Sequence, residues 1–185
     1  MARDSKDSRA PRVPKEEKQY DERVVAVDRV ARVVKGGRRF RFRALVVIGD
    51  GKGKIGVGTA KGADVTAAVS KATEVAKKSV VTIAINKDTI PHEQQARVGG
   101  AKILLKPAAA GTGLIAGGVV RVVLEVAGIR NALSKSLGSS NKINTAYATV
   151  DALKAIQPKS KWHTSLINKT AEKNAKSEAK KVEEK

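Results

Sequence analysis

Residues 35–58 read KGGRRFRFRALVVIGDGKGKIGVG, and their pattern predicts the structure of the first part of the chain. The preceding residues, 24–34, are rich in β-branched side chains, which is typical of a strand. The glycines that open the quoted stretch end this run and predict a turn at 35–38. From residue 39 to residue 43 arginine and phenylalanine alternate, which places three arginines on one face of a strand and two phenylalanines on the other. The pattern predicts a β-hairpin, although 24–34 also fits a helical period passably.

The same stretch continues into a third strand and then a helix. Residues 49–53 form a second glycine-rich turn, and residues 54–60 follow it as a strand. Asp64 is typical of a helix N-cap, so we expect a helix over 65–78. Its apolar stripe consists of Val65, Ala68, Val69, Ala72, Val75 and Ala76. The first folded unit is therefore predicted as β-β-β-α.

A second unit is predicted to begin with another β-branched run, 80–85, which indicates a strand. A turn at 97–100 leads into a strand at 101–106, and Pro107 ends that strand. Glycines at 111–113 then indicate a loop.

Two helices are expected after this loop. Residues 119–127 have strand propensity, but Arg121 and Glu125 lie four apart and make one polar stripe on an otherwise buried helix. We favour the helix, with Gly128 directly after its end. Asn141 caps a last helix, which Pro158 ends. Its apolar side consists of Ile143, Ala146, Tyr147, Val150, Leu153 and Ile156.

The charge balance indicates a polyanionic partner. The 185 residues include 37 Lys and Arg against 18 Asp and Glu, a formal net charge of +19. Self-repulsion of this size is costly until phosphates neutralise it, so nucleic acid is the expected partner and an anionic membrane surface the alternative. The chain has no cysteine, which excludes disulfides, thiolate metal sites and a cysteine nucleophile.

The two ends of the chain differ in composition from its centre. Residues 1–20 and 159–185 are polar and mix both charges, so we expect flexible basic tails. Residues 1–6 lack the apolar stretch of a secretion signal. The most apolar run, 114–127, contains charges and is too short to span a bilayer. A cytoplasmic protein without membrane-spanning segments is expected.

Three patterns resemble enzyme motifs, and each lacks part of its set. Residues 51–56 fit G-x-G-x-x-G, but a strand follows them instead of the helix that a dinucleotide site needs. The same stretch is not a Walker loop, because neither Lys52 nor Lys54 is followed by Ser or Thr. His92 lacks the second histidine of a zinc-protease helix, and His163 lies in a polar stretch. We expect no catalytic residue, metal or cofactor; a nucleotide-binding enzyme that uses 49–58 is the alternative from another class.

The cations are most concentrated between residues 35 and 54. One acid, Asp50, lies among seven cations: Lys35, Arg38, Arg39, Arg41, Arg43, Lys52 and Lys54. This run favours a phosphate-contacting surface near two adjacent turns over a merely solvated face. Only 3% of residues are aromatic, and Phe40 and Phe42 are the only candidates on the sheet for base stacking, although such residues are more often in the core. Recognition of the shape and phosphates of a folded RNA therefore fits better than base stacking.

Across roughly residues 21–157 the chain resembles the bacterial small-subunit ribosomal protein five family. The matching motifs, in order, include Val34-Lys35-Gly36-Gly37-Arg38, Gly49-Asp50-Gly51-x-Gly53, Ile55-Gly56-Val57-Gly58, Pro107-Ala108-x-x-Gly111-Thr112-Gly113, Arg121-x-Val123-Leu124-Glu125-x-Ala127-Gly128 and Lys135-x-x-Gly138-Ser139-x-Asn141. The ordered series makes the resemblance specific. The chain departs from the family at the arginine run 39–43, which is more basic than usual, and at Ala60, where the family often has Gly or another small residue.

The resemblance implies an α+β fold of two small domains. The first, 21–85, is similar to double-stranded-RNA-binding domains (β-β-β-α), and the second, 86–158, is of βαβ type with a left-handed crossover. Members are structural constituents of the small ribosomal subunit that bind its ribosomal RNA and contact ribosomal proteins four and eight. They lie near the messenger RNA entry channel and influence decoding fidelity. The chain is then expected to be ribosome-bound, neither an enzyme nor a homo-oligomer.

Sequence and resemblance together give a set of expected contacts. The residues expected to bind ribosomal RNA are Lys35, Gly36, Gly37, Arg38, Arg39, Arg41, Arg43, Lys52, Lys54 and Lys61. By its position in the family motif, the 34–38 turn is implied to lie in ribosomal RNA near the spectinomycin site. Gly111, Gly113 and Arg121 are implied to lie toward ribosomal protein four.

Overall fold

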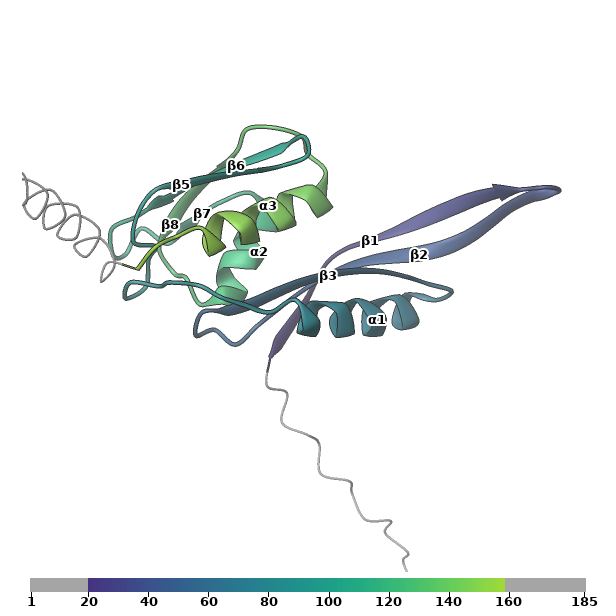
Figure 1. Cartoon of the computed structure of the whole chain (residues 1–185), viewed down its shortest axis with the longest axis horizontal. Coiled ribbons are helices and arrows are strands. Elements are labelled where there is room, and N and C mark those ends of the chain that lie inside the picture. The colour runs from purple at the N-terminus through teal and green to yellow at the C-terminus, as the bar shows by residue number, and fades with distance from the viewer. Residues whose placement is uncertain (1–19, 159–185) are drawn as a thin grey trace, which may run out of the picture.

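The computed structural model describes residues 20–158, which form two four-stranded sheets and three helices (Figure 1). The two predicted tails lie outside the described residues, Tyr20 excepted. Each sheet has its own helical layer, and the mixed α+β fold class is confirmed.

The first sheet contains β1 (Asp21–Val34), β2 (Gly37–Gly49), β3 (Lys54–Gly62) and β4 (Val81–Thr82) in that order, and all neighbouring pairs are antiparallel. α1 (Val65–Lys78) joins β3 to β4 and packs on β2 and β3. The predicted hairpin and the β-β-β-α order are confirmed. The helical alternative for 24–34 is wrong.

Glycines on β3 allow α1 to lie close against the sheet. A Cβ atom at Gly58 would lie 2.2 Å from the carbonyl oxygen of Ala72, and one at Gly56 would lie 2.4 Å from that of Ala76. The fully buried residues of α1 are Ala68, Ala72 and Ala76. The predicted stripe was right for these alanines and for Val69, which is partly buried against the same core, but wrong for Val65 and Val75, which are exposed.

The second half of β2 is buried on both faces. Ala44, Val46 and Ile48 pack against α1, whereas Leu45 and Val47 belong to the core of the second domain. Since side chains alternate along a strand, the odd-numbered face that carries the arginines at 39–43 is the face that meets the second domain further along β2.

The second sheet has the order β5-β6-β8-β7. β5 (Gln94–Val98), β6 (Ala101–Pro107) and β8 (Ala132–Ser136) are antiparallel neighbours, and β7 (Leu114–Ile115) lies parallel to β8. β7 and β8 are joined by α2 (Gly118–Ala127), which completes the βαβ unit.

Both helices of the second unit are present as predicted, although the last one ends at Lys154, before Pro158. α2 ends at Gly128, whose φ of 89° lies in the left-handed region that glycine adopts without strain. α3 (Lys142–Lys154) begins after Asn141, whose side chain accepts a hydrogen bond of 3.2 Å from the amide of Ile143.

Other expectations for the second unit need correction. The predicted strand at 80–85 is reduced to β4, and it pairs with β3 in the first sheet instead of opening the second unit. The chain leaves that sheet at Ile83, whose amide donates to the carbonyl of Gly53 at 2.8 Å. β5 and β8 were not predicted, because their glutamines, serines and lysine hide the strand pattern of QQARV and ALSKS.

The two domains meet where the β2–β3 turn lies against the C-terminal end of α2. The amide of Gly51 donates to the carbonyl of Val126 and that of Gly53 to the carbonyl of Ala127, each at 3.1 Å. These carbonyls lack partners within the helix, so the turn satisfies them. A Cβ atom at Gly128 would lie 2.1 Å from the carbonyl oxygen of Gly51. The junction therefore requires glycine on the helix side.

Candidate nucleic-acid interface

The β1–β2 hairpin extends well beyond the rest of the first sheet (Figure 1). β3 ends at Gly62, which pairs with Phe42, so residues 37–41 of β2 have only β1 beside them. This part of the hairpin is a two-stranded ribbon without a core of its own. Side chains on both of its faces are available to a partner.

One face of the ribbon is cationic. The strand register sets Arg39 opposite Arg32 and Arg41 opposite Val30, and at the base of the ribbon Lys61 of β3 lies opposite Arg43. A hollow of about 520 Å³ opens on this face. It is lined by Val30, Ala31, Arg32, Val34, Arg39, Arg41 and Lys61. Four of these residues are cations and none is an acid, so this hollow attracts anions such as phosphates.

Arg32 belongs to this surface although the sequence analysis did not select it. It lies on β1, three residues before the turn, and only the register of the hairpin shows that it faces Arg39. Once the turn is placed at residues 35–36, the directly opposite pair could have been derived from the sequence.

Arg43, by contrast, already has an anionic partner in the chain. Its Nη2 atom lies 2.8 Å from a carboxylate oxygen of Asp28, the residue directly opposite on β1. About a third of the Arg43 side chain is exposed. The structure therefore separates Arg43, which is neutralised, from Arg39 and Arg41, for which the described part of the chain provides no ion pair.

The tip of the hairpin is fully exposed. Lys35 and Gly36 form the turn, and the φ of Gly36, 85°, lies in the left-handed region. Gly37 follows at the start of β2, and Arg38 lies opposite Val33 on the face away from Arg39. The tip thus presents cations to both sides of the ribbon.

Lys52 and Lys54 lie at the other end of the sheet. β2 has 13 residues, which corresponds to about 40 Å at roughly 3.3 Å per residue. The two turns of a meander lie at opposite ends of their common strand, so the expected cluster of seven cations is in fact two separate groups. Lys52 and Lys54 are exposed beside the domain junction.

The glycine-rich turn itself is not a phosphate cradle in this structure. The amides of Gly51 and Gly53 are bonded to α2, and those of Lys52 and Lys54 donate to Oδ1 of Asp50 at 2.8 and 2.9 Å. Burial raises the pKa of Asp50, but the hydrogen bonds from Lys54 and Lys52 outweigh it and hold the pKa below its ordinary value. The main-chain donors that a nucleotide loop needs are engaged within the chain.

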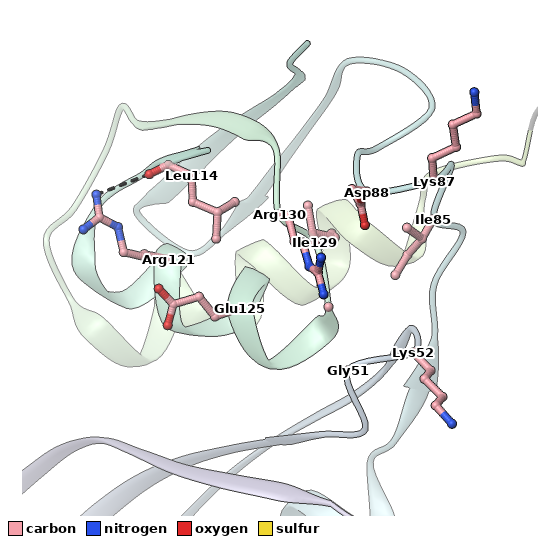
Figure 2. Close-up of a pocket in the computed structure, with 11 residues that line it drawn as sticks. Gly51, Lys52, Ile85, Lys87, Asp88, Leu114, Arg121, Glu125, Ile129 and Arg130 are labelled. Atoms are coloured by element: carbon pink, nitrogen blue, oxygen red, sulfur yellow. Dashed lines mark hydrogen bonds between the residues drawn. The ribbon is translucent and has the colours of Figure 1, made fainter. Parts of the chain in front are cut away.

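A second, larger hollow lies at the domain junction (Figure 2). It measures about 850 Å³. Its charged lining residues are Lys52, Lys87, Asp88, Arg121, Glu125 and Arg130. Figure 2 shows Arg121 next to Glu125 at one end, with its Nη2 donating to the carbonyl of Leu114 at 3.3 Å. Cations and acids both line this hollow, so its field is weaker than that of the ribbon.

Two amides of the loop that precedes β7 share one side-chain acceptor. The Oδ1 atom of Asn131 accepts hydrogen bonds from the amides of Gly111 and Gly113, at 3.2 and 3.0 Å. Asn131 is buried, whereas Gly111 and the neighbouring Thr112 are exposed. The loop is an ordered surface feature next to the N-terminal end of α2, on which Arg121 lies.

Residues 20–158 contain no group of three or more His, Cys, Asp or Glu side chains that could hold a metal ion. Within the same range, no helix is long and apolar enough to cross a membrane.

The fold and the ribbon define a protein of the α+β class whose first domain carries a long hairpin with a cationic face suited to a polyanion. Comparison with protein families then identifies the family. Residues 20–84 match the family model for ribosomal protein S5, N-terminal domain, and residues 96–163 match that for ribosomal protein S5, C-terminal domain. The chain belongs to the ribosomal protein S5 family, as the sequence motifs predicted. It is a structural protein of the small ribosomal subunit and binds ribosomal RNA.

Proposed function

We propose that this chain holds folded small-subunit ribosomal RNA mainly through the cationic face of the β1–β2 ribbon, as a scaffold without a catalytic step. The observation that carries the proposal is the hollow at Arg32, Arg39, Arg41 and Lys61, where four cations have no acid among them. Such a surface binds the phosphate backbone and fixes the position of the protein on a folded RNA.

The RNA contact is assigned to two groups of residues. The first, on the ribbon, comprises Arg32, Lys35, Gly36, Gly37, Arg38, Arg39, Arg41 and Lys61. The second comprises Lys52 and Lys54 at the domain junction, where they contact a separate part of the RNA. Arg43 is already paired with Asp28, so its contribution to RNA binding is smaller than that of Arg39 or Arg41.

Gly111, Gly113 and Arg121 are proposed as the surface toward ribosomal protein four. The exposed loop, fixed by Asn131, and the adjacent α2 form an ordered surface suited to a protein neighbour. Contacts with ribosomal protein eight, a place near the messenger entry channel and an influence on decoding accuracy are part of the same proposal, since the family resemblance implies them.

The boundary between the domains is proposed at residues 85–86. Before it, β4 still pairs in the first sheet. After it, the amides of Arg130 and Asn131 donate to the carbonyl of Asp88, and Thr89 bridges to Asn131. The segment that starts at Asn86 therefore belongs with the second sheet.

Sedimentation tests this function. The full chain is expected to sediment with small ribosomal subunits and to remain bound through salt washes that remove loosely attached proteins. The variant Arg39→Gln/Arg41→Gln should be released at lower salt, whereas Lys102→Gln/Lys154→Gln, which removes two exposed lysines of the second domain, should behave like the wild type. A chain that sediments apart from the subunit would instead be a free RNA chaperone.

A further inference from the structure

The second face of the ribbon carries exposed apolar side chains. Alternation and register place Phe40 opposite Ala31 on this face, together with Val33. Phe40 is 49% exposed and Val33 is 77% exposed. From its hydrophobicity Phe40 was expected in the core, and this expectation is wrong.

The position of β3 and α1 explains why Phe40 remains outside the core. Phe42 lies opposite the last residue of β3 and packs against the alanine face of α1. Phe40 is one step further along the same face, beyond the end of β3. No element of the described chain covers the ring there except its neighbour on β1.

That neighbour is Arg29. Its guanidinium carbon lies 3.7 Å from the centre of the Phe40 ring. A guanidinium stacked flat on an aromatic ring keeps its N–H groups, which lie at the edge of the plane, free for hydrogen bonds. The pair forms a platform in which a cation lies over a ring that is still half-exposed to solvent.

The charge of this face indicates the kind of ligand. Along the ribbon it carries Arg29 and Arg38 beside Ala31, Val33 and Phe40, and it carries no acid. The exposed apolar side chains on this face of the ribbon are Ala31, Val33 and Phe40, which together are small for a protein interface. Bases stack on aromatic rings and on arginine planes, and phosphates lie next to such bases.

We infer that the Arg29–Phe40 pair binds an unpaired base of ribosomal RNA by stacking, on the face of the ribbon opposite the cationic hollow. This inference rests on the proposed function, because it requires RNA at the hairpin. RNA then encloses the ribbon from both sides: phosphates on the face of Arg39 and Arg41, and a base on the face of Phe40.

The test compares affinity and salt dependence for the full-length chain on a small-subunit ribosomal RNA fragment. Phe40→Leu removes the ring and keeps an apolar side chain and all charges. We expect its affinity to fall about 5- to 100-fold, the range for loss of one base stack, while the slope of log Kobs against log salt stays unchanged because no cation is lost. Val33→Ala, on the same face without a ring, should bind nearly as the wild type.

A second measurement reports the stack itself. Trp162 is the single tryptophan of the chain, so Phe40→Trp in a Trp162→Phe background places one fluorophore on the platform. Addition of the RNA fragment should quench its fluorescence, and affinity should stay near that of the wild type. Phe40→Leu should keep the wild-type urea midpoint, since Phe40 lies outside the core.

The possible failures are distinguishable. Wild-type affinity of Phe40→Leu, or fluorescence of the Phe40→Trp variant that RNA leaves unchanged, would overturn the base-stacking inference and leave the proposed function intact. The same holds if Phe40→Leu binds the naked RNA normally but loses affinity for the assembled subunit, which would assign the platform to a protein neighbour. An unchanged salt slope for Arg39→Gln/Arg41→Gln in the same assay would contradict the proposed function.

Discussion

The carboxylate of Asp28 lies 2.8 Å from Nη2 of Arg43, directly across the two strands of the hairpin. The innermost of the three alternating arginines is thus neutralised within the chain, and the other two are not paired with any described acid. The cationic surface is therefore displaced toward the tip of the ribbon, away from the core of the first domain.

Removal of the Asp28 charge should strengthen RNA binding. Asp28→Asn frees Arg43 and deletes the anion nearest the cationic hollow. We expect higher affinity, and a salt slope steeper by up to about 0.7–0.9 if Arg43 gains a phosphate contact. Asp21→Asn, at the far end of β1, is the matched control. Equal effects of the two changes would show that only net charge matters. Stability should change by less than about 1 kcal/mol, because the ion pair is largely solvated.

The packing of α1 on β3 should not tolerate a methyl group. In Gly58→Ala the new Cβ would lie 2.2 Å from the carbonyl oxygen of Ala72. The helix has to move, and we expect a loss of about 2–3 kcal/mol in the free energy of unfolding. Gly118→Ala, in the first turn of α2 with nothing within 4 Å, is the control and should be neutral or slightly stabilising. Urea unfolding measures both, and equal midpoints would refute this packing.

Asp50 should make stability depend on pH in the acid range. The fold lowers its pKa, so the ionised carboxylate stabilises the folded state above the unfolded pKa of about 3.9. This contribution is lost as the pH falls through the lower, folded pKa. Asp50→Asn keeps an acceptor oxygen but cannot titrate. The stability difference between wild type and Asp50→Asn should therefore be constant near neutrality and shrink below about pH 4; a difference that is the same at pH 7 and pH 3 would contradict the assignment.

Asn131 should control the loop before β7. Asn131→Ala leaves the amides of Gly111 and Gly113 without their common acceptor, which we expect to cost about 1–2 kcal/mol. Asn131→Asp keeps an acceptor oxygen at the same place and should lose less. If Gly111 and Gly113 do face ribosomal protein four, Asn131→Ala should also weaken binding to that protein in a pull-down, in proportion to the loss of loop order. Unchanged binding would remove the loop from that interface.

The alternation of arginine and phenylalanine at 39–43 predicted much of the fold, because side chains that alternate with a period of two indicate a strand and show which residues share each of its faces. Gly128 and Asn141 likewise predicted the ends of helices correctly, since their local geometry depends on few neighbours. The burial of α1 was harder to predict. Val65 and Val75 are more apolar than alanine, but the positions of α1 that lie directly against Gly56 and Gly58 are the alanines Ala72 and Ala76.

Most cations of the candidate site were identified from the sequence, but their positions in the fold were predicted less well. Lys52 and Lys54 are close to Arg39 in the sequence, yet the length of β2 carries them to the opposite end of the sheet. Arg32 could not be assigned without the register, and the pairing of Arg43 with Asp28 depends on the same register. Phe40 was misjudged because hydrophobicity alone predicts burial, whereas the end of β3 leaves this ring without cover.

The salt dependence of binding to small-subunit ribosomal RNA shows whether the cationic face of the ribbon contacts phosphates. The triple variant Arg32→Gln/Arg39→Gln/Arg41→Gln should lose about 0.7–0.9 from the slope of log Kobs against log salt for each arginine that contacts a phosphate. Lys102→Gln/Lys142→Gln/Lys154→Gln, with the same change in net charge on the second domain, should keep the wild-type slope. An unchanged slope in the arginine variant, or an equal loss in both variants, would contradict an RNA interface on the ribbon.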